Sequence, residues 1–393
     1  MKSVRLLGFL AICLWAATYW LPVQPGLAQG APGGRRGLCL PGALPLPGDC
    51  LALGPAAYRA RLAELGMSLP LPPIPAMLVD PAYAEVNVRY GLVRSSNAPV
   101  FASLEDAMSA NRKAASQFIQ GEFTYISYTD EAVVNGKRYY MIDALSWMTA
   151  NDVSRIGALP RFQGLVLNRT PRTPFGWVLS YFSAEPVKTK RTPGYHSQDY
   201  TGHTLQLHEV VWVFGEQSVD GESWYMVGPD EWVPARLVAR VLPNITPPEG
   251  VSGERWIEVN LFEQTLAVYD QRRLVFATLI ASGAEPFWTR PGTFQIREKL
   301  EATVMRGGFD ASGAGGYYLE DVPWTMYFDG ARALHGAYWR AKLGYPQSHG
   351  CINLSVGDAH WLFEWANLGD WVYVWDPSGK TPTDPNLYPD WGY

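Results

Sequence analysis

A short stretch near the C-terminal end of the sequence gathers residue types that carry out nucleophilic chemistry. It is Ser348-His349-Gly350-Cys351-Ile352-Asn353, and His335-Gly336 precedes it. Catalysis by cysteine needs a thiolate, a nearby base and backbone N–H groups that hold an oxyanion. The stretch offers candidates for all three. The same spacing also fits a buried apolar thiol or a metal site, so spacing alone leaves the choice open.

The composition narrows the class of protein. The chain has 393 residues, which predicts two to four domains, and its net charge of -5 gives no electrostatic case for nucleic-acid binding. Charged residues make up only 18% of the chain, whereas glycine, proline and aromatic residues are plentiful. This mixture predicts a mainly β protein with rigid turns.

The N-terminus has the pattern of an export signal. Lys2 and Arg5 precede an apolar run from Leu6 to Leu21, and Gly26-Leu27-Ala28 fits a cleavage site. We therefore expect a signal peptide over 1–28, or an uncleaved anchor if cleavage fails, and an extracytoplasmic location in the cell wall or periplasm. Only such an anchor would contact a membrane.

Cysteine usage agrees with export. Cys39 and Cys50 lie in a Pro/Gly-rich stretch and can form a disulfide in an oxidising compartment. Cys351 is then left unpaired, and an odd thiol in an exported protein indicates reactivity.

The middle of the chain contains an internal repeat. Gly136-Lys137-Arg138-Tyr139-Tyr140-Met141 recurs as Gly221-Glu222-Ser223-Trp224-Tyr225-Met226, and Trp147 recurs as Trp232 at the same offset of 85. Each copy predicts short alternating strands and a small β-barrel, similar to bacterial SH3-like domains. Leu104–Gln120 in the first copy predicts a helical insertion, and His196–His208 in the second predicts a polar loop. His203 and His208 lack a third residue at metal-ligand spacing.

The organisation that we predict has six parts. They are the signal at 1–28, a Pro/Gly-rich linker at 29–85 with a short helix at 55–65, repeats at 86–160 and 172–243, a further β-rich domain at 253–376 and a tail at 377–393. In that domain, Arg306–Gly316 predicts a mobile flap, and Ser355 is expected to cap a helix.

The domain at 253–376 resembles the L,D-transpeptidase catalytic domain, the YkuD domain. The resemblance rests on His335-Gly336 followed by Ser348-His349-Gly350-Cys351-Ile352-Asn353, supported by Thr289–Phe294 and Asp321–Met326. It implies a β-sandwich with a short helix. It also implies a cysteine nucleophile that acts on the tetrapeptide stems of peptidoglycan, without a cofactor or a metal. Here Gly336 stands where well-studied members have serine.

The resemblance and the residue types together assign roles. Cys351 would be the nucleophile and His335 the proton acceptor and donor, while His349 and the backbone of Gly350 would support the thiolate and the oxyanion. Candidate substrate contacts are Gly336, Ser348, Asn353, Tyr318, Trp324 and Tyr338. The expected partners are peptidoglycan stem peptides, and we expect a monomer.

Several alternatives remain open at this point. Water or a protein amine would replace the stem acceptor in an L,D-carboxypeptidase or in a protein-to-wall attachment enzyme. In an NlpC-type cysteine peptidase the cysteine precedes its histidine, whereas here both candidate histidines precede Cys351. A zinc site of His335, His349 and Cys351 lacks a fourth ligand at useful spacing. A wall-binding protein that has lost catalysis is the non-enzymatic alternative.

Overall fold

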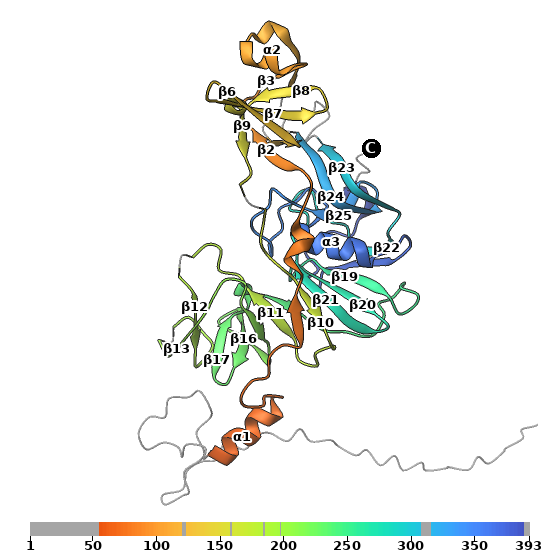
Figure 1. The fold of residues 1–393 in the computed structure, drawn as a ribbon. Coiled ribbons are helices and arrows are strands. Elements are labelled where there is room, and N and C mark those ends of the chain that lie inside the picture. The colour runs from red at the N-terminus through yellow and green to blue at the C-terminus, as the bar shows by residue number, and fades with distance from the viewer. Residues whose placement is uncertain are drawn as a thin grey trace, which may run out of the picture.

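The computed structural model describes residues 55–119, 123–157, 159–183, 185–196, 198–307 and 316–388 (Figure 1). The expected signal, the Cys39–Cys50 pair and most of the glycine-rich segment after Arg306 lie outside these residues. Strands dominate the described part, so the expectation of a mainly β protein is confirmed; its α-helices are α1 (Pro55–Glu64), α2 (Leu104–Ser109) and α3 (Val356–Trp365). None of the described helices is long and apolar enough to span a membrane.

Two large sheets pack against each other in the C-terminal part. Their facing side chains, such as Val268 and Phe276 from one sheet and Met326 and Leu334 from the other, form one buried core. The first sheet follows the order β1 (Ala76–Leu78), β10 (Leu165–Leu167), β21 (Arg273–Leu279), β20 (Thr265–Asp270), β19 (Trp256–Asn260), β27 (Trp371–Trp375) and β22 (Gly292–Gln295). The second follows β26 (Ile352–Leu354), β25 (Arg332–Gly336), β24 (Tyr317–Asp329), β5 (Phe123–Tyr128), β2 (Arg89–Val93) and β9 (Val153–Arg155), with β23 (Glu298–Gly307) paired to β24.

Helix α3 covers the second sheet and begins where the sequence predicts. The Ser355 side chain accepts the Asp358 N–H at 3.2 Å, which caps the first turn. Ala359 and Leu362 enter the core between the sheets. The fully buried Asp358 carboxylate accepts hydrogen bonds from the Gly164 N–H and from the Thr278 hydroxyl. One side chain thus ties the helix to β21 and to the segment between the repeats.

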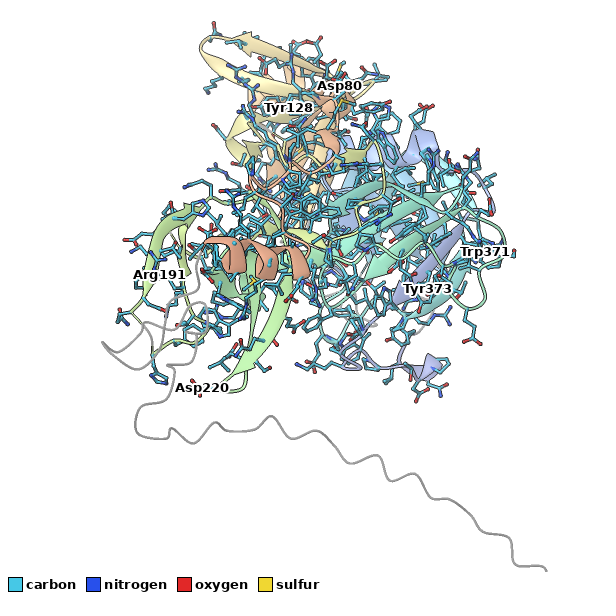
Figure 2. The ribbon with its side chains drawn as sticks, turned by 90° about the horizontal axis from the view of Figure 1, so that it is seen from below. Asp80, Tyr128, Arg191, Asp220, Trp371 and Tyr373 are labelled. Atoms are coloured by element: carbon cyan, nitrogen blue, oxygen red, sulfur yellow. The ribbon has the colours of Figure 1, made fainter. Side chains whose placement is uncertain are left out.

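The internal repeat is visible in the structure. β6 (Asp130–Val134), β7 (Lys137–Asp143), β8 (Ser146–Thr149) and β9 correspond to β15 (Gly215–Val219), β16 (Glu222–Gly228), β17 (Glu231–Pro234) and β18 (Val238–Val241), and each begins 85 residues earlier than its counterpart. The other strands of the repeats are β3 (Ala98–Phe101), β4 (Ala115–Ile119), β11 (Phe175–Val178), β12 (Val187–Lys190), β13 (Tyr200–Leu205) and β14 (Val210–Trp212). Figure 2 shows Arg191 and Asp220 of the second repeat on the opposite side from Trp371 and Tyr373 of β27. The likeness to SH3 domains stays a prediction.

Segments outside the domain at 253–376 complete both of its sheets. β1 lies in the predicted linker, and it pairs with β10, which pairs with β21. β5 of the first repeat runs parallel to β24, with Phe123–Tyr125 opposite Tyr317–Leu319. The first repeat and the C-terminal domain therefore share one sheet. This arrangement depends on pairing between distant segments, so it cannot be predicted from local sequence patterns.

Two local expectations were wrong in part. The helix expected over Leu104–Gln120 ends at Ser109, because Ala110 adopts a left-handed conformation (φ 53°), and the chain then forms β4 against β3. The polar loop expected over His196–His208 contains β13, which pairs with β12. Backbone pairing to a neighbouring strand outweighs local composition in both segments.

Candidate active site

Neighbouring strands β25 and β26 bring the candidate residues together. The two strands are parallel, and His335 lies opposite Asn353. Cys351 directly precedes β26, two residues before Asn353, so the alternation of side chains directs both toward the same face as His335. The two parts of the sequence motif, which are separated along the chain, thus lie side by side on paired strands.

The His335 imidazole is buried and held at both nitrogens. Its Nδ1 lies 3.2 Å from the Gly336 carbonyl oxygen, which only accepts hydrogen bonds, so Nδ1 carries the proton. Nε2 lies 3.0 Å from Asn353 Nδ2 and accepts its N–H. Glycine avoids a tight contact at position 336, because a Cβ would lie 3.0 Å from Pro323 Cγ and 3.3 Å from Val356 Cα. The backbone of Gly336 thus orients the imidazole.

Arg340 extends this arrangement and was not predicted from the sequence. Its Nε donates to Asn353 Oδ1 at 2.9 Å, which turns the amide N–H groups of Asn353 toward His335. The guanidinium also donates to the Gln347 side chain at 3.3 Å. Asn353 was predicted as a candidate substrate contact; in the structure its amide connects Arg340 to His335.

Cys351 is partly exposed, and its thiol lies 3.8 Å from the Ala331 carbonyl oxygen. Removal from water raises the pKa of the Cys351 thiol. Burial lowers the pKa of His335 to about 4. Both shifts favour the uncharged forms, so the resting pair is a thiol and a neutral imidazole that carries its proton on Nδ1 and accepts a hydrogen bond at Nε2.

The loop before Cys351 is fixed by its own hydrogen bonds. The Ser348 hydroxyl donates to the Cys351 carbonyl and accepts the Gly350 N–H at 3.1 Å. The Gly350 N–H that the sequence assigned to an oxyanion hole is therefore used inside the loop, and the backbone N–H groups of His349 and Cys351 remain as candidates. Both hydrogen bonds of the Ser348 hydroxyl stabilise the loop, so the structure gives Ser348 a structural role in place of the predicted substrate contact.

A buried arginine lies directly beneath this loop. Gly350 has φ 108°, and a Cβ there would lie 3.2 Å from Arg332 Nε, so glycine fits the position in both backbone and space. Arg332 lowers the pKa of the Cys351 thiol against the larger effect of burial. Its guanidinium donates to Asp329 at 3.2 Å and lies 5.2 Å from the ring centre of Tyr388 in the tail. Neither Arg332 nor this role for the tail was predicted.

His349 faces the aromatic side of the site. Its ring lies 4.6 Å from that of Phe287 and 5.3 Å from that of Tyr317. Burial, and next the charge of Arg340, lower the pKa of His349. His349 is thus neutral at pH 7, which agrees with a supporting role and not with a cation paired to a thiolate.

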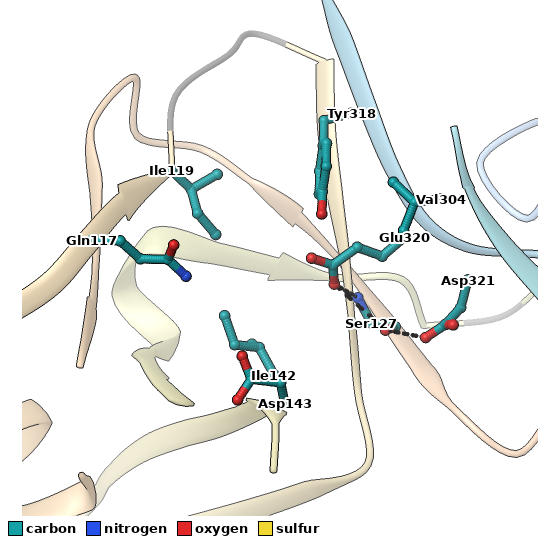
Figure 3. Close-up of a pocket in the computed structure, with 9 residues that line it drawn as sticks. All are labelled: Gln117, Ile119, Ser127, Ile142, Asp143, Val304, Tyr318, Glu320 and Asp321. Atoms are coloured by element: carbon teal, nitrogen blue, oxygen red, sulfur yellow. Dashed lines mark hydrogen bonds between the residues drawn. The ribbon is translucent and has the colours of Figure 1, made fainter. Parts of the chain in front are cut away.

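The three aromatic residues among the candidate substrate contacts have different surroundings. Tyr318 lines a cavity of about 570 Å³ between the first repeat and β24, together with Ser127, Glu320 and other residues (Figure 3). Trp324 stacks on His360 of α3 with ring centres 3.6 Å apart. Tyr338 is only 1% exposed and donates to the Glu320 carbonyl oxygen. Trp324 and Tyr338 therefore pack the protein, and substrate contact by them is not supported.

The first repeat supplies rings behind the catalytic face. Tyr90 of β2 stacks on Tyr338, and Tyr125 of β5 lies 5.9 Å from Tyr338 and 6.2 Å from Trp339. Trp339 in turn lies 5.7 Å from His335. These contacts were not predicted, because they depend on the pairing of β5 with β24.

The described residues contain no group of three or more His, Cys, Asp or Glu side chains that could hold a metal ion. His203 contacts Glu231, and His208 contacts the Tyr181 hydroxyl. Both histidines thus have protein partners.

The C-terminal part is defined by two packed sheets and by a cysteine, a histidine and a backbone carbonyl gathered on neighbouring strands. A cysteine beside a histidine is a residue pair that is able to carry out acyl transfer. Residues 254–374 match the family model of the YkuD domain, the L,D-transpeptidase catalytic domain. This part of the chain belongs to that family.

Known relatives carry the same name. L,D-transpeptidase 1 of Mycobacterium tuberculosis is 29% identical over 168 residues, which is 37% of this chain and 65% of the relative. A putative L,D-transpeptidase of Bacillus subtilis, YciB, is 26% identical over 28% of this chain and 59% of its own length. The chain thus spans less than two thirds of the curated relatives that it matches.

Solved structures of the same family are also similar. The catalytic domain of an Enterococcus faecium L,D-transpeptidase is 27% identical, with a TM-score of 0.29, and is covered in full by 32% of this chain. An L,D-transpeptidase from Stackebrandtia nassauensis is 25% identical, with a TM-score of 0.27 and coverage of 34% of this chain and 59% of that one.

Proposed function

We propose that the protein is an exported peptidoglycan L,D-transpeptidase with Cys351 as its nucleophile. The observation that carries the proposal is the arrangement on β25 and β26, where Nδ1 of His335 is bound to the Gly336 carbonyl and Cys351 lies on the same face. The family match at 254–374 supports the reaction class. Export is supported by the N-terminal sequence alone.

The chemistry proceeds in two halves. Sγ of Cys351 attacks the carbonyl carbon that follows the L-centre in a tetrapeptide stem, and its proton passes to Nε2 of His335. The tetrahedral oxyanion collapses, the C–N bond breaks, and the terminal D-residue leaves as an amine that takes the proton from His335. A thioester remains on Cys351. The amine of a second stem then attacks the thioester, gives its proton to His335 and restores the thiol.

The resting geometry adds one requirement to this scheme. Nε2 of His335 accepts the Asn353 N–H, so this hydrogen bond must break or lengthen before Nε2 receives the thiol proton. Because His335 and Cys351 are both uncharged at pH 7, the thiol must give its proton to His335 on the way to the thioester. Fast alkylation of the resting thiol at neutral pH is therefore not expected, although the sequence motif alone suggests it.

Acylation by a carbapenem tests the nucleophile. A solved LD transpeptidase that is 21% identical to this chain, with a TM-score of 0.29, is in complex with imipenem. We expect imipenem to add one molecule to the whole chain, as measured by intact mass, and none to Cys351→Ala. Cys351 is the free cysteine of the described residues, so an adduct on Cys351→Ala would place the reaction elsewhere.

The transfer reaction needs its own assay. A disaccharide-tetrapeptide incubated with the protein should give a crosslinked dimer and free terminal D-amino acid, both seen by liquid chromatography and mass spectrometry. Release of the D-amino acid without dimer would instead indicate L,D-carboxypeptidase activity. An imipenem adduct without either product would contradict peptidoglycan stems as the substrate.

A further inference from the structure

A chain of hydrogen bonds leads from Arg340 to the imidazole of the proposed base. Arg340 Nε donates to Asn353 Oδ1 at 2.9 Å, and Asn353 Nδ2 donates to His335 Nε2 at 3.0 Å. The chain ends where His335 Nδ1 donates to the Gly336 carbonyl oxygen at 3.2 Å. The imidazole therefore lies in the middle of a path that runs from a guanidinium to a backbone carbonyl.

Both ends of this chain allow only one direction of donation. An arginine side chain has N–H donors, has no acceptor and stays charged in proteins, whereas a carbonyl oxygen only accepts. The Asn353 amide could turn either its oxygen or its nitrogen toward the imidazole, and Arg340 removes that choice. Nε2 of His335 must then be the unprotonated nitrogen, which is the form that a base for the Cys351 proton needs.

The surroundings of Arg340 give no other reason for an arginine. Its side chain is partly buried, and in the part of the chain that the structure describes it forms no ion pair. Its hydrogen bonds go to uncharged oxygens of Asn353 and Gln347. Removing a charge from water without a paired carboxylate costs free energy, so stability alone does not favour arginine here. A use that needs a strict donor does.

Gln347 holds the guanidinium on its other side. Arg340 Nη1 donates to Gln347 Oε1 at 3.3 Å, and Nη2 donates to the Gln347 carbonyl oxygen. The Gln347 amide nitrogen donates to the carbonyl oxygens of Lys342 and Tyr345, at 3.0 and 3.3 Å. We call residues 340–347 the connecting loop, since they join the two halves of the sequence motif. Its internal hydrogen bonds fix Arg340 relative to the loop.

The second repeat packs against the connecting loop. The Tyr181 hydroxyl of that repeat accepts the Leu343 N–H at 3.2 Å. Gly344 has φ 92°, and a Cβ there would lie 2.7 Å from Leu179 Cδ1 of the same repeat. On its other side, the Gly344 N–H donates to the carbonyl oxygen of Ile280, which follows β21, at 2.7 Å. The connecting loop is therefore enclosed between the second repeat and the first sheet.

We propose that Arg340 is a positioning residue for His335, which acts through Asn353 to keep the proton off Nε2, and that the second repeat holds the connecting loop that carries it. This inference rests on the proposed function, because it takes His335 as the base for Cys351. It gives the second repeat a part in catalysis that needs no contact with the substrate.

The ring nitrogens of His335 report the tautomer directly. Their nitrogen chemical shifts, read through the carbon-bound ring protons of the whole chain, distinguish a protonated from an unprotonated nitrogen, and His335→Ala identifies the signals. The parent should show a protonated Nδ1 and an unprotonated Nε2. Arg340→Met keeps the length of the side chain but removes its donors, so the form with a proton on Nε2 should appear. Arg340→Lys keeps a charged donor and should retain the parental shifts.

Imipenem acylation measures the consequence for the reaction. In Arg340→Met the maximal acylation rate should fall about tenfold, because the base is no longer held in its reactive form. The imipenem concentration that gives half of the maximal rate should stay the same, since Arg340 acts on the base. Arg273→Met, which changes an exposed arginine of β21, is the matched control for both measurements and should behave as the parent does.

Tyr181→Phe tests the part of the second repeat. The change removes only the hydroxyl that accepts the Leu343 N–H, and it should lower the maximal acylation rate several-fold. Tyr200→Phe removes an exposed hydroxyl from the same repeat and should react at the parental rate. A parental rate in Tyr181→Phe would overturn the role of the second repeat.

Unchanged nitrogen shifts of His335 in Arg340→Met would overturn the role of Arg340. A loss of rate that only matches the unfolded fraction in melting curves would overturn it too, because it would show a purely structural role. If Arg340→Met does not fold, Asn353→Ala takes its place. That variant keeps Arg340 but removes the amide that transmits its effect, so it should change the His335 shifts in the same way, and unchanged shifts would again overturn the proposal.

The two proposals fail in different ways. Altered His335 shifts in Arg340→Met, without any imipenem adduct on the parent, would contradict the proposed catalysis and leave the control of the tautomer by Arg340 standing. An adduct on the parent, with unchanged shifts in Arg340→Met, would do the reverse.

Discussion

At the residue scale, the site is a set of neutral groups held ready for proton transfer. Nδ1 of His335 donates a hydrogen bond to the Gly336 carbonyl oxygen, and Nε2 accepts one from the Asn353 side chain. Burial keeps the imidazole unprotonated down to a pKa of about 4 and keeps the thiol protonated. The ability of His335 to accept a proton therefore persists well below neutral pH.

Asn353→Asp should change the pH dependence of acylation. A carboxylate oxygen in place of the amide nitrogen, 3.0 Å from Nε2, would stabilise the imidazolium and raise the pKa of His335 from about 4. The pH below which imipenem acylation slows should then rise by more than about one pH unit. Below the new pKa, the acylation rate should fall roughly tenfold for each pH unit. Asn367→Asp, in an exposed turn, is the control. If Asn353→Asp left the pH dependence of acylation unchanged, His335 would not be the base.

Arg332→Gln should make the thiol less reactive. Arg332 is the cation that lowers the pKa of Cys351, so its loss raises that pKa further and reduces the thiolate fraction at any given pH. Alkylation by iodoacetamide at pH 8 should slow several-fold, and its midpoint should move to higher pH. Arg297→Gln provides the comparison, and equal alkylation rates would show that Arg332 does not act on the thiol.

At the scale of elements, the site depends on strands and a helix that are fixed from several directions. α3 follows β26 directly, and Asp358 in its first turn ties it to Thr278 of β21 and to Gly164. Val356 of α3 packs closely against Gly336, since a Cβ built at Gly336 would lie 3.3 Å from Val356 Cα. Movement of α3 would therefore disturb this contact. The helix thus supports the backbone that orients His335.

Asp358→Ala should lower the stability of the whole chain. The change leaves the Gly164 N–H buried without its acceptor, which costs about 2 kcal/mol in the free energy of unfolding, while the Thr278 hydroxyl can still donate to the Leu279 carbonyl oxygen. Urea unfolding followed by tryptophan fluorescence measures the effect. Glu364→Ala, on the exposed side of the same helix, should change stability little, and equal losses in the two variants would contradict the specific role of Asp358.

The sequence predicted the elements that local patterns determine. Ser355 and the apolar residues after it predicted α3, and the offset of 85 between the copies predicted corresponding strands. The partners of those strands were not predictable, because β5 with β24 and β10 with β21 join residues far apart in the chain. For the same reason the motif indicated His335, Cys351 and Asn353, whereas Arg332, Trp339 and Tyr125 depend on contacts that no local pattern encodes.

At the scale of the whole molecule, the first repeat and the C-terminal domain share a partly buried acidic contact. Ser127 of β5 donates its N–H to Glu320 of β24 at 2.8 Å, and its hydroxyl donates to Asp321 (Figure 3). Burial raises the pKa of Glu320 to about 7. The junction between these two parts is therefore sensitive to pH near neutrality.

Glu320→Gln should stabilise the chain at alkaline pH. Because the folded pKa of about 7 lies above the unfolded value of 4.5, the stability gained from protonated Glu320 is complete below pH 4.5 and is lost as pH rises through 7. The amide still accepts the Ser127 N–H and carries no charge, so the melting temperature should rise at pH 8 and change little at pH 5. Glu301→Gln, an exposed change in β23, is the control; an equal shift at both pH values would contradict this assignment.

Strands from the N-terminal part complete both sheets of the C-terminal domain, and this limits which parts of the gene can be exchanged by recombination. A recombination that replaced everything before residue 250 would remove β10 and β5 together, and these pair with β21 and β24. Both sheets of the C-terminal domain would then end on unpaired edges, which promote aggregation. An exchanged N-terminal part would have to bring its own strands to both positions. The two halves of the chain are therefore expected to pass between lineages as one genetic unit.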